Sequence, residues 1–193
     1  MFILSILSDL IRIPPHTFNV PIQEALKNEI HQKYSNKVLA NVGLVLSLWD
    51  IMDIKEGLLR PGDGASYVEI KFRMVVWKPF IGEIVEGTVN DCTLEGIKVK
   101  LEFFDDIFIP QKMLFENCEF KGVEKAWVWK PDEDTELFID IGEKIRFRVE
   151  EEAFFNVKPK TNINNEVEKS STPPYAIVAS CQTDGMGCVS WWD

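Results

Sequence analysis

The side chains that could carry out bond-making chemistry in this sequence are an aspartate pair, four cysteines and two histidines. Asp105 and Asp106 could hold a metal ion, but they stand between two predicted strands, where aspartates that favour turns are expected. No His accompanies a Ser or Cys in a catalytic signature, and no phosphate-binding glycine loop precedes a predicted helix. The sequence therefore predicts a protein that is not an enzyme and uses no cofactor.

The cysteines do not have the spacing of a metal site. They stand at positions 92, 118, 181 and 188 without a Cys-x-x-Cys pair, and only His16 and His31 could join them as ligands. A structural zinc site needs four ligands at close spacing. We therefore predict no metal and interpret the cysteines as buried thiols in a reducing compartment.

A different chemistry, the binding of nucleic acid, is indicated by the second half of the chain. Apolar and charged residues alternate over 97–102, and the next predicted strand carries Phe108 between two isoleucines. If the apolar residues point inward, an outward set can contact phosphates and stack on a base. That set consists of Lys98, Lys100, Phe108, Arg146 and Arg148. The alternative interpretation of these residues is an ordinary solvated surface.

The distribution of charge opposes tight binding of RNA or DNA. Residues 1–80 carry a net charge of +1, whereas residues 81–193 carry −11. Phosphates are bound by neutralising them with cations, so an acidic domain has little affinity for nucleic acid by itself. We therefore expect any contact with single-stranded RNA to be weak.

Strand, helix, strand and strand are expected in this order in the first part of the chain. Residues 2–13 form a strand rich in Ile and Leu that stops at two prolines, and residues 21–36 form a helix with one apolar face. Apolar residues alternate over 38–48 and over 68–76, which predicts two strands with one apolar face each. The helix would cover that face, giving an α+β domain with a curved antiparallel sheet.

Between the last two of these strands, the segment Asp53–Gly64 is predicted to be a loop. It contains three glycines and a proline, with Leu58 and Leu59 at its tip. Two interpretations of the leucines stay open: they fold back onto the sheet, or they form a protruding hydrophobic docking surface.

The boundary between two domains, residues 1–80 and 81–193, is expected at Trp77–Phe80, where a proline interrupts the strand pattern. Short strands that are curved at glycines and polar on one side suit a small closed barrel, and their order resembles an S1-like OB fold. The second domain is therefore expected to be all-β.

Three further segments are expected in the barrel: Trp127–Trp129, a strand with alternating residues at 144–149, and residues 175–192. Residues 156–172 are rich in Asn and poor in apolar residues, which predicts a flexible insertion between the last two strands. No stretch is long and apolar enough to cross a membrane, and residues 2–7 lack the basic flank of a signal peptide. We expect a soluble intracellular protein that binds no membrane.

This arrangement resembles the larger subunit of the stalk of archaeal and eukaryotic nuclear RNA polymerases, and the similarity is greatest to the RNA polymerase III version. The resemblance covers nearly the whole chain. Its most specific segments are Phe103–Pro110, Pro174–Ile177 and Ser190–Trp192. One departure is Ile97, at a position where many S1 domains have an aromatic residue.

The resemblance implies a non-catalytic nuclear protein that pairs with a smaller helical stalk subunit and docks on the polymerase core. It places core docking on the tip loop, with Lys55, Leu58, Leu59 and Arg60, and RNA contact on the barrel. It also implies a role with initiation factors in transcription of small RNA genes. Two alternatives are a free-standing S1 RNA-binding protein and the stalk subunit of another nuclear or archaeal polymerase. An enzyme with an accessory OB domain is a third, but 193 residues leave little room for a catalytic site.

Overall fold

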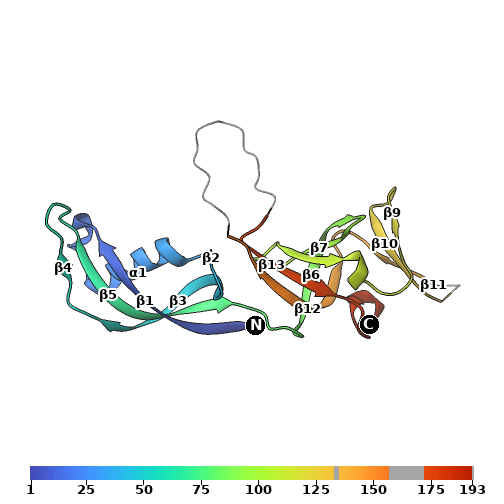
Figure 1. Cartoon of the computed structure of the whole chain (residues 1–193), viewed down its shortest axis with the longest axis horizontal. Helices are drawn as coiled ribbons and strands as arrows, with labels where there is room; N and C mark the ends of the chain where they lie inside the picture. The colour runs from blue at the N-terminus through green and yellow to red at the C-terminus, as the bar shows by residue number, and fades with distance from the viewer. Residues whose placement is uncertain (133–134, 157–171, 193) are drawn as a thin grey trace, which may run out of the picture. The chain divides into compact units, whose positions relative to one another are not determined.

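The computed structural model describes residues 1–132, 135–156 and 172–192 (Figure 1). Contacts divide the chain into two units, Met1–Lys78 and Pro79–Asp193. The insertion predicted at 156–172 lies, apart from its two end residues, outside the described residues. Among the helices that the structure describes, none has the length and apolar character needed to span a membrane.

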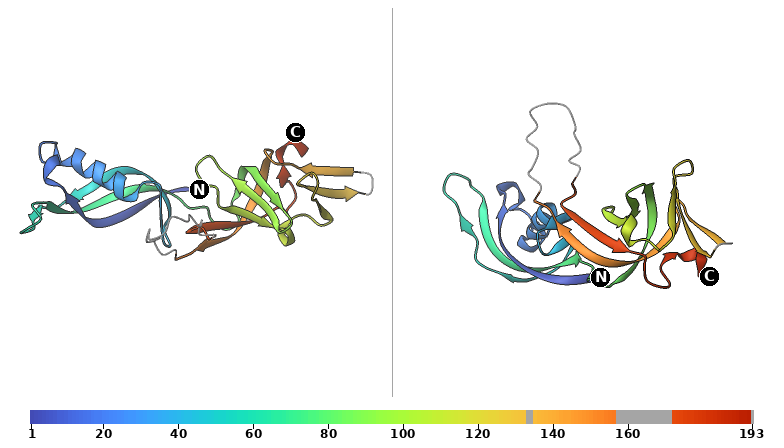
Figure 2. Two further views of the ribbon diagram at one scale, coloured as in Figure 1. Left: turned by 90° about the horizontal axis from the view of Figure 1, so that it is seen from above. Right: turned by 45° about the vertical axis from the view of Figure 1, so that its right-hand side comes forward.

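The N-terminal unit is an antiparallel sheet in the order β1-β5-β3-β2, with one helix lying against it. The short strand β4 pairs with the first two residues of β5. The elements are β1 (Phe2–Ile13), η1 (Pro15–Thr17), α1 (Ile22–Tyr34), β2 (Lys37–Leu39), β3 (Gly43–Ile54), β4 (Leu58–Leu59) and β5 (Ser66–Trp77). The predicted α+β domain with a curved antiparallel sheet is confirmed, and Figure 2 shows the sheet bending around α1.

Strand β3 differs from the prediction because its pairing with β5 is interrupted at regular intervals. Register shifts between Val45 and Ser47, and twice more at three-residue steps, insert one extra residue each time. Consequently every third residue of β3, beginning at Val45, lies on the face that packs against the core. The single apolar face predicted over 38–48 was wrong, because β2 and β3 form a hairpin around Asn41 and β3 contains bulges. Bulges bend a strand, which accounts for the curvature of the sheet.

The core of this unit lies between α1 and the concave face of the sheet. Leu26 and Ile30 of α1 are fully buried against inward residues of β5, and Phe72 also contacts the ring of Tyr34. At the end of the helix, the hydroxyl of Tyr34 and the ammonium of Lys33 donate to the carboxylate of Asp9 on β1. The helix is thus held to the sheet by apolar packing along its length and by a charged contact at its end.

The C-terminal unit is a closed barrel of five strands. Its strands pair in the order β6-β7-β8-β13-β12, and β12 closes the barrel by pairing with β6. Only β8 and β13 are parallel. The strands are β6 (Ile84–Thr93), β7 (Gly96–Lys100), β8 (Ile107–Pro110), β12 (Lys144–Phe154) and β13 (Tyr175–Ser180), with the short β14 (Gly187–Cys188) beside β12. The predicted all-β barrel is confirmed.

A separate three-stranded sheet interrupts the barrel sequence between β8 and β12. It consists of β9 (Cys118–Lys121), β10 (Ala126–Asp132) and β11 (Thr135–Ile139), in the order β11-β10-β9. The prediction that Trp127–Trp129 belongs to the barrel was wrong, because this segment pairs only with β9 and β11. Trp127 nevertheless joins the two sheets, since its buried indole donates to the carbonyl of Thr93 on β6 at 3.1 Å.

The end of the chain packs on this additional sheet. Trp129 of β10 stacks on Phe115, which follows the short helix η2 (Gln111–Met113), and on Trp191 of the short helix η3 (Val189–Trp191), with ring centroids 4.2 and 5.5 Å apart. Gly187 has a φ of +94°, and a Cβ there would lie 2.4 Å from the ring of Trp191. The tryptophans near the C-terminus therefore have a structural role, and the stack requires glycine at 187.

Candidate nucleic-acid interface

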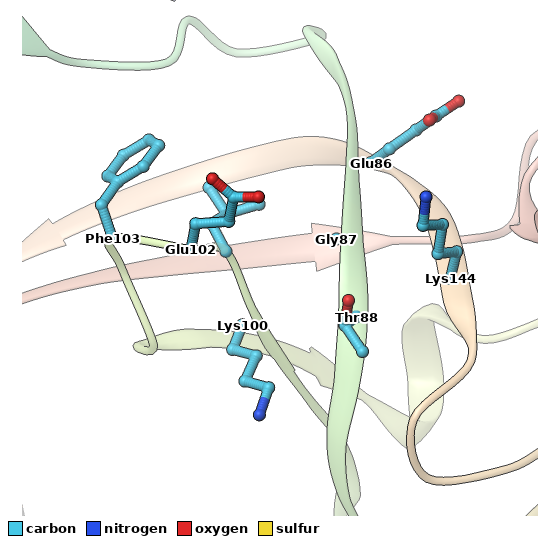
Figure 3. Close-up of a pocket in the computed structure, with 8 residues that line it drawn as sticks. Glu86, Gly87, Thr88, Lys100, Glu102, Phe103 and Lys144 are labelled. Carbon is cyan, nitrogen blue, oxygen red and sulfur yellow. The ribbon is translucent and has the colours of Figure 1, made fainter.

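Three neighbouring barrel strands bring two lysines onto one outward row. Thr88 of β6 is the register partner of both Lys144 on β12 and Lys100 on β7. The two lysines are exposed, and in Figure 3 their side chains lie on opposite sides of Thr88. Among the residues that the structure describes, neither lysine has an ion-pair partner. This row therefore offers uncompensated positive charge on the barrel surface.

A shallow hollow of about 330 Å³ lies over this row. Glu86, Glu102 and Phe103 complete its lining, together with Gly87, Thr88, Leu101 and the two lysines (Figure 3). The carboxylates oppose phosphate binding, whereas the exposed part of the Phe103 ring offers a face on which a base can stack. The chemistry of the hollow suits a weak contact with a single strand.

Lys144 and Phe103, the cation and the ring that this hollow adds to Lys100, were not among the predicted site residues. Lys144 shares the alternation of Arg146 and Arg148 along β12, so the same pattern could have identified it. Phe103 follows the end of β7, outside any regular strand, and no periodicity in the sequence marks it as exposed.

The predicted arginines are less available than the lysines. Arg146 donates to Glu86 on the adjacent strand at 2.8 Å, and Arg148 lies 3.3 Å from Glu150. The positive charge of both arginines is thus partly neutralised by a neighbouring carboxylate. A glutamate beside each guanidinium agrees with the acidic balance of residues 81–193 in lowering the attraction for phosphate.

Phe108 on β8 and Lys98 on β7 are register partners, a pairing that the sequence analysis did not predict. Lys98 is exposed, but Phe108 is only partly exposed, with Val178 of β13 on its other side. Ile97 is fully buried in the barrel, so an aromatic residue at that position would lie in the core. The residue type at 97 consequently gives no information about stacking on the outer surface.

The cysteines and Asp106, which the sequence analysis considered for reactive or metal-binding roles, have structural roles. Burial raises the pKa of Cys92 and Cys118 to about 11 and that of Cys181 to about 12, so these thiols are protonated at neutral pH. Burial, and next the charge of Asp105, raises the pKa of Asp106, whose backbone carbonyl accepts from Ile177 at the β8–β13 junction. Within the described residues, no three His, Cys, Asp or Glu side chains form a group that could hold a metal.

The candidate docking residues lie at one end of the N-terminal unit. Leu58 and Leu59 form β4 and are 73% and 69% exposed, so the segment predicted as a loop contains a short strand with two outward leucines. Arg60 is also exposed, whereas Lys55 forms an ion pair with Glu69 at 2.7 Å. The leucines therefore do not bury themselves on the sheet.

The turn after β4 is fixed by a charged cluster. Arg12 at the end of β1 donates twice to the carboxylate of Asp63, at 2.7 and 3.0 Å, and the hydroxyl of Tyr67 donates to it at 2.7 Å. The hydrogen bonds from Arg12 and then Tyr67 hold the pKa of Asp63 far below its ordinary value. These hydrogen bonds tie the turn after β4 to the end of β1 and the start of β5.

Beside β4 lies an apolar hollow of about 410 Å³. Its lining includes Leu59 of β4, Phe18 and Val20 of the segment between β1 and α1, and Ile22 at the start of α1. These side chains are all at least one-third exposed. We name Leu58, Leu59 and the lining of this hollow the tip surface.

Comparison with known proteins identifies a family for both units. The family described as RNA polymerase III subunit Rpc25 matches residues 83–192, and the SHS2 domain found in the N terminus of Rpb7p/Rpc25p/MJ0397 matches residues 8–64. The chain is 49% identical over 212 residues to DNA-directed RNA polymerase III subunit RPC8 of Saccharomyces cerevisiae, with both chains covered completely.

Two further relatives show how the similarity is distributed. Subunit rpc8 of RNA polymerase III from Schizosaccharomyces pombe is 46% identical over 202 residues, again with complete coverage of both chains. The archaeal RNA polymerase subunit Rpo7 of Saccharolobus solfataricus is 34% identical over 140 residues, covering 72% of this chain and 76% of the archaeal one. The similarity to these two RNA polymerase III subunits is thus higher and more complete than the similarity to the archaeal subunit.

These matches confirm the resemblance inferred from the sequence motifs, including its closeness to the RNA polymerase III version. They also confirm the predicted combination of an N-terminal α+β domain with a C-terminal barrel in one chain. The chain belongs to the RPC8/Rpc25 family of RNA polymerase III subunits, a non-catalytic family with an Rpb7-like N-terminal domain and a barrel.

Proposed function

We propose that this chain is the larger subunit of the RNA polymerase III stalk, in the nucleus, where it supports initiation on small RNA genes. The observation that carries the proposal is the 49% identity, over the full length of both chains, to an RNA polymerase III subunit. In this function the chain pairs with a smaller helical stalk subunit and works together with initiation factors. It makes and breaks no covalent bond itself.

Docking on the polymerase core is assigned to the tip surface. Leu58 and Leu59 are the most exposed leucines of the N-terminal unit, and Arg60 adds a cation beside them. Hydrogen bonds that already restrain the turn after β4 reduce the conformational entropy lost when the leucines enter a pocket, which favours their use as anchors. Lys55, the fourth residue assigned to docking, precedes β4 and forms an ion pair with Glu69.

Contact with emerging RNA is assigned to the outward face of β7, β6 and β12. Lys98, Lys100 and Lys144 supply the uncompensated cations, and Phe103 and Phe108 supply rings. Arg146 and Arg148 contribute less, because glutamates lie beside them. The net charge of −11 keeps the affinity low, so binding depends on the core holding the transcript nearby at an effective concentration of roughly millimolar.

Affinity purification of the tagged chain from cells tests the proposal against its alternatives. The expected result is recovery of the largest RNA polymerase III subunits in amounts equal to the tagged chain. A free-standing S1 protein would instead be recovered with RNA or ribosomes and without polymerase subunits. Recovery with the subunits of RNA polymerase I or II would assign the chain to another nuclear stalk.

A further inference from the structure

Another hollow of the C-terminal unit is lined by β10 and by the loops that precede β9 and follow β13. Its volume is about 460 Å³, and its lining includes two rings, a proline and two carboxylates: Phe115, Trp129, Pro131, Glu116 and Asp184. We name it the Trp129 hollow. It shares no residue with the hollow over the lysine row of the barrel. Ring faces and carboxylates in one hollow are the groups with which proteins hold a cationic side chain.

The indole of Trp129 is only partly used by the fold. Phe115 and Trp191 both stack on it, and the centroids of these two rings are 6.1 Å apart. Rings on opposite faces of an indole would be at least about 7 Å apart, twice the usual contact distance, so both rings lie on the same side of Trp129. In the part of the chain that the structure describes, the indole N–H of Trp129 donates to no acceptor, and it is accessible to solvent. The fold therefore leaves a hydrogen-bond donor and one ring face without an aromatic partner.

The two carboxylates of the Trp129 hollow are not used by the fold either. Glu116 and Asp184 are exposed, and neither carboxylate has a hydrogen bond or an ion pair among the described residues. The cation of the lining, Lys130, is already held by Glu119 at 2.9 Å and by Glu136 at 3.5 Å. The hollow thus has a negative charge that no described residue compensates, within a domain whose net charge is −11.

A neighbouring hollow of about 530 Å³ lies at the end of β10. It shares Asn117, Lys130 and Pro131 with the Trp129 hollow and adds the carboxylates of Glu119 and Asp132. Asp132 has no ion-pair partner among the residues that the structure describes. Two hollows that share a wall suit an extended chain segment, which advances about 3.3 Å per residue, better than they suit one small molecule.

We infer that these two hollows bind an extended segment of another protein that carries an arginine, whose guanidinium enters the Trp129 hollow. A planar guanidinium stacks on an indole face and makes paired hydrogen bonds to a carboxylate, whereas a lysine ammonium acts only as a point charge. The net charge of −10 argues against a second copy of this chain as the occupant, and the carboxylates repel the phosphates of nucleic acid. The inference goes beyond the proposed function, because the site lies on this chain alone and needs no assembled polymerase.

The test is binding of a capped peptide, one arginine between alanines, to the isotope-labelled full-length chain. Matched peptides carry lysine, glutamate or citrulline, which has the shape of arginine without its charge. The NMR signal of the Trp129 indole N–H, assigned with Trp129→Phe, should shift and saturate with the arginine peptide. The citrulline and glutamate peptides should bind at least about tenfold more weakly, and the lysine peptide at least about threefold. Equal binding of the lysine or citrulline peptide, a saturating shift with single-stranded RNA only, or no shift at all would overturn the inference.

A double variant that removes both carboxylates, Glu116→Gln with Asp184→Asn, gives an independent readout by fluorescence anisotropy of the labelled arginine peptide. Because both side chains are exposed, the variant should fold like the wild type by circular dichroism. It should lose at least about tenfold in affinity. The matched control, Glu95→Gln with Glu124→Gln, removes two exposed carboxylates outside both hollows and should lose less than about twofold. An unchanged affinity of the first variant, or equal losses of the two, would overturn the inference.

Discussion

The double substitution Leu58→Ser and Leu59→Ser should weaken attachment to the polymerase core without unfolding the chain. Full burial of a leucine side chain contributes about 1.5–3 kcal/mol. The two leucines are 73% and 69% exposed in the free chain, so each has about two-thirds of that, or about 1–2 kcal/mol, left to gain on docking. Together they should contribute about 2–4 kcal/mol, which is roughly 30- to 700-fold in affinity.

The assay is binding of the purified stalk heterodimer to a polymerase core from which the stalk has been removed. Leu94→Ser is the matched control, because Leu94 is 69% exposed but lies in the C-terminal unit. Both variants should keep the free energy of unfolding within about 0.5 kcal/mol of the wild type, since exposed side chains contribute little to folding. Core binding of the leucine variant at wild-type affinity, or an equal loss with Leu94→Ser, would refute the assignment of the tip surface.

Three further predictions concern the barrel and the charged contacts. Lys100→Ala with Lys144→Ala should weaken RNA binding by the heterodimer and reduce the slope of log affinity against log salt by about 1.4, as measured by fluorescence anisotropy; an unchanged slope would contradict the placement of the site. Although burial alone would raise the pKa of Asp9, contacts from Lys33 and Tyr34 outweigh it and hold this pKa below its ordinary 3.8, so Asp9→Asn should be less stable than the wild type at neutral pH. That difference in unfolding free energy should shrink as the pH falls below about 4, because protonation then removes the contribution of the carboxylate; a difference independent of pH would argue against this role. Gly187→Ala should cost about 1–3 kcal/mol by crowding the ring of Trp191, measured by denaturant unfolding against Gly185→Ala, which has a similar φ and open space; equal costs would rule out the crowding.

The regular elements could be predicted because their patterns are local. Strand β1 was predicted from its richness in Ile and Leu and from the two prolines that follow it, and its predicted bounds of 2–13 equal the observed ones. The helix was predicted from one apolar face, and the structure shortens it to Ile22–Tyr34. Glycines and a proline marked the strands β7 and β8 of the barrel.

The errors arose where the structure departs from simple periods. In β3 the bulges replace the two-residue period by one of three residues, which the sequence does not announce. The additional sheet around Trp129 uses the same strand-forming residue types as the barrel, so composition could not separate the two. The ion pair that makes Arg146 less available to RNA could not be predicted either, because its partner Glu86 lies sixty residues away in the chain.

The central claim, that this chain is a non-catalytic stalk subunit needed for initiation, is tested most directly by transcription with polymerase depleted of it. RNA polymerase III lacking the chain should still extend RNA from a tailed template but should lose most initiation from a promoter in the presence of initiation factors. Adding the wild-type heterodimer should restore initiation, and adding the Leu58→Ser, Leu59→Ser variant should not. Full promoter-dependent initiation without the chain, or loss of RNA extension on the tailed template, would contradict the account.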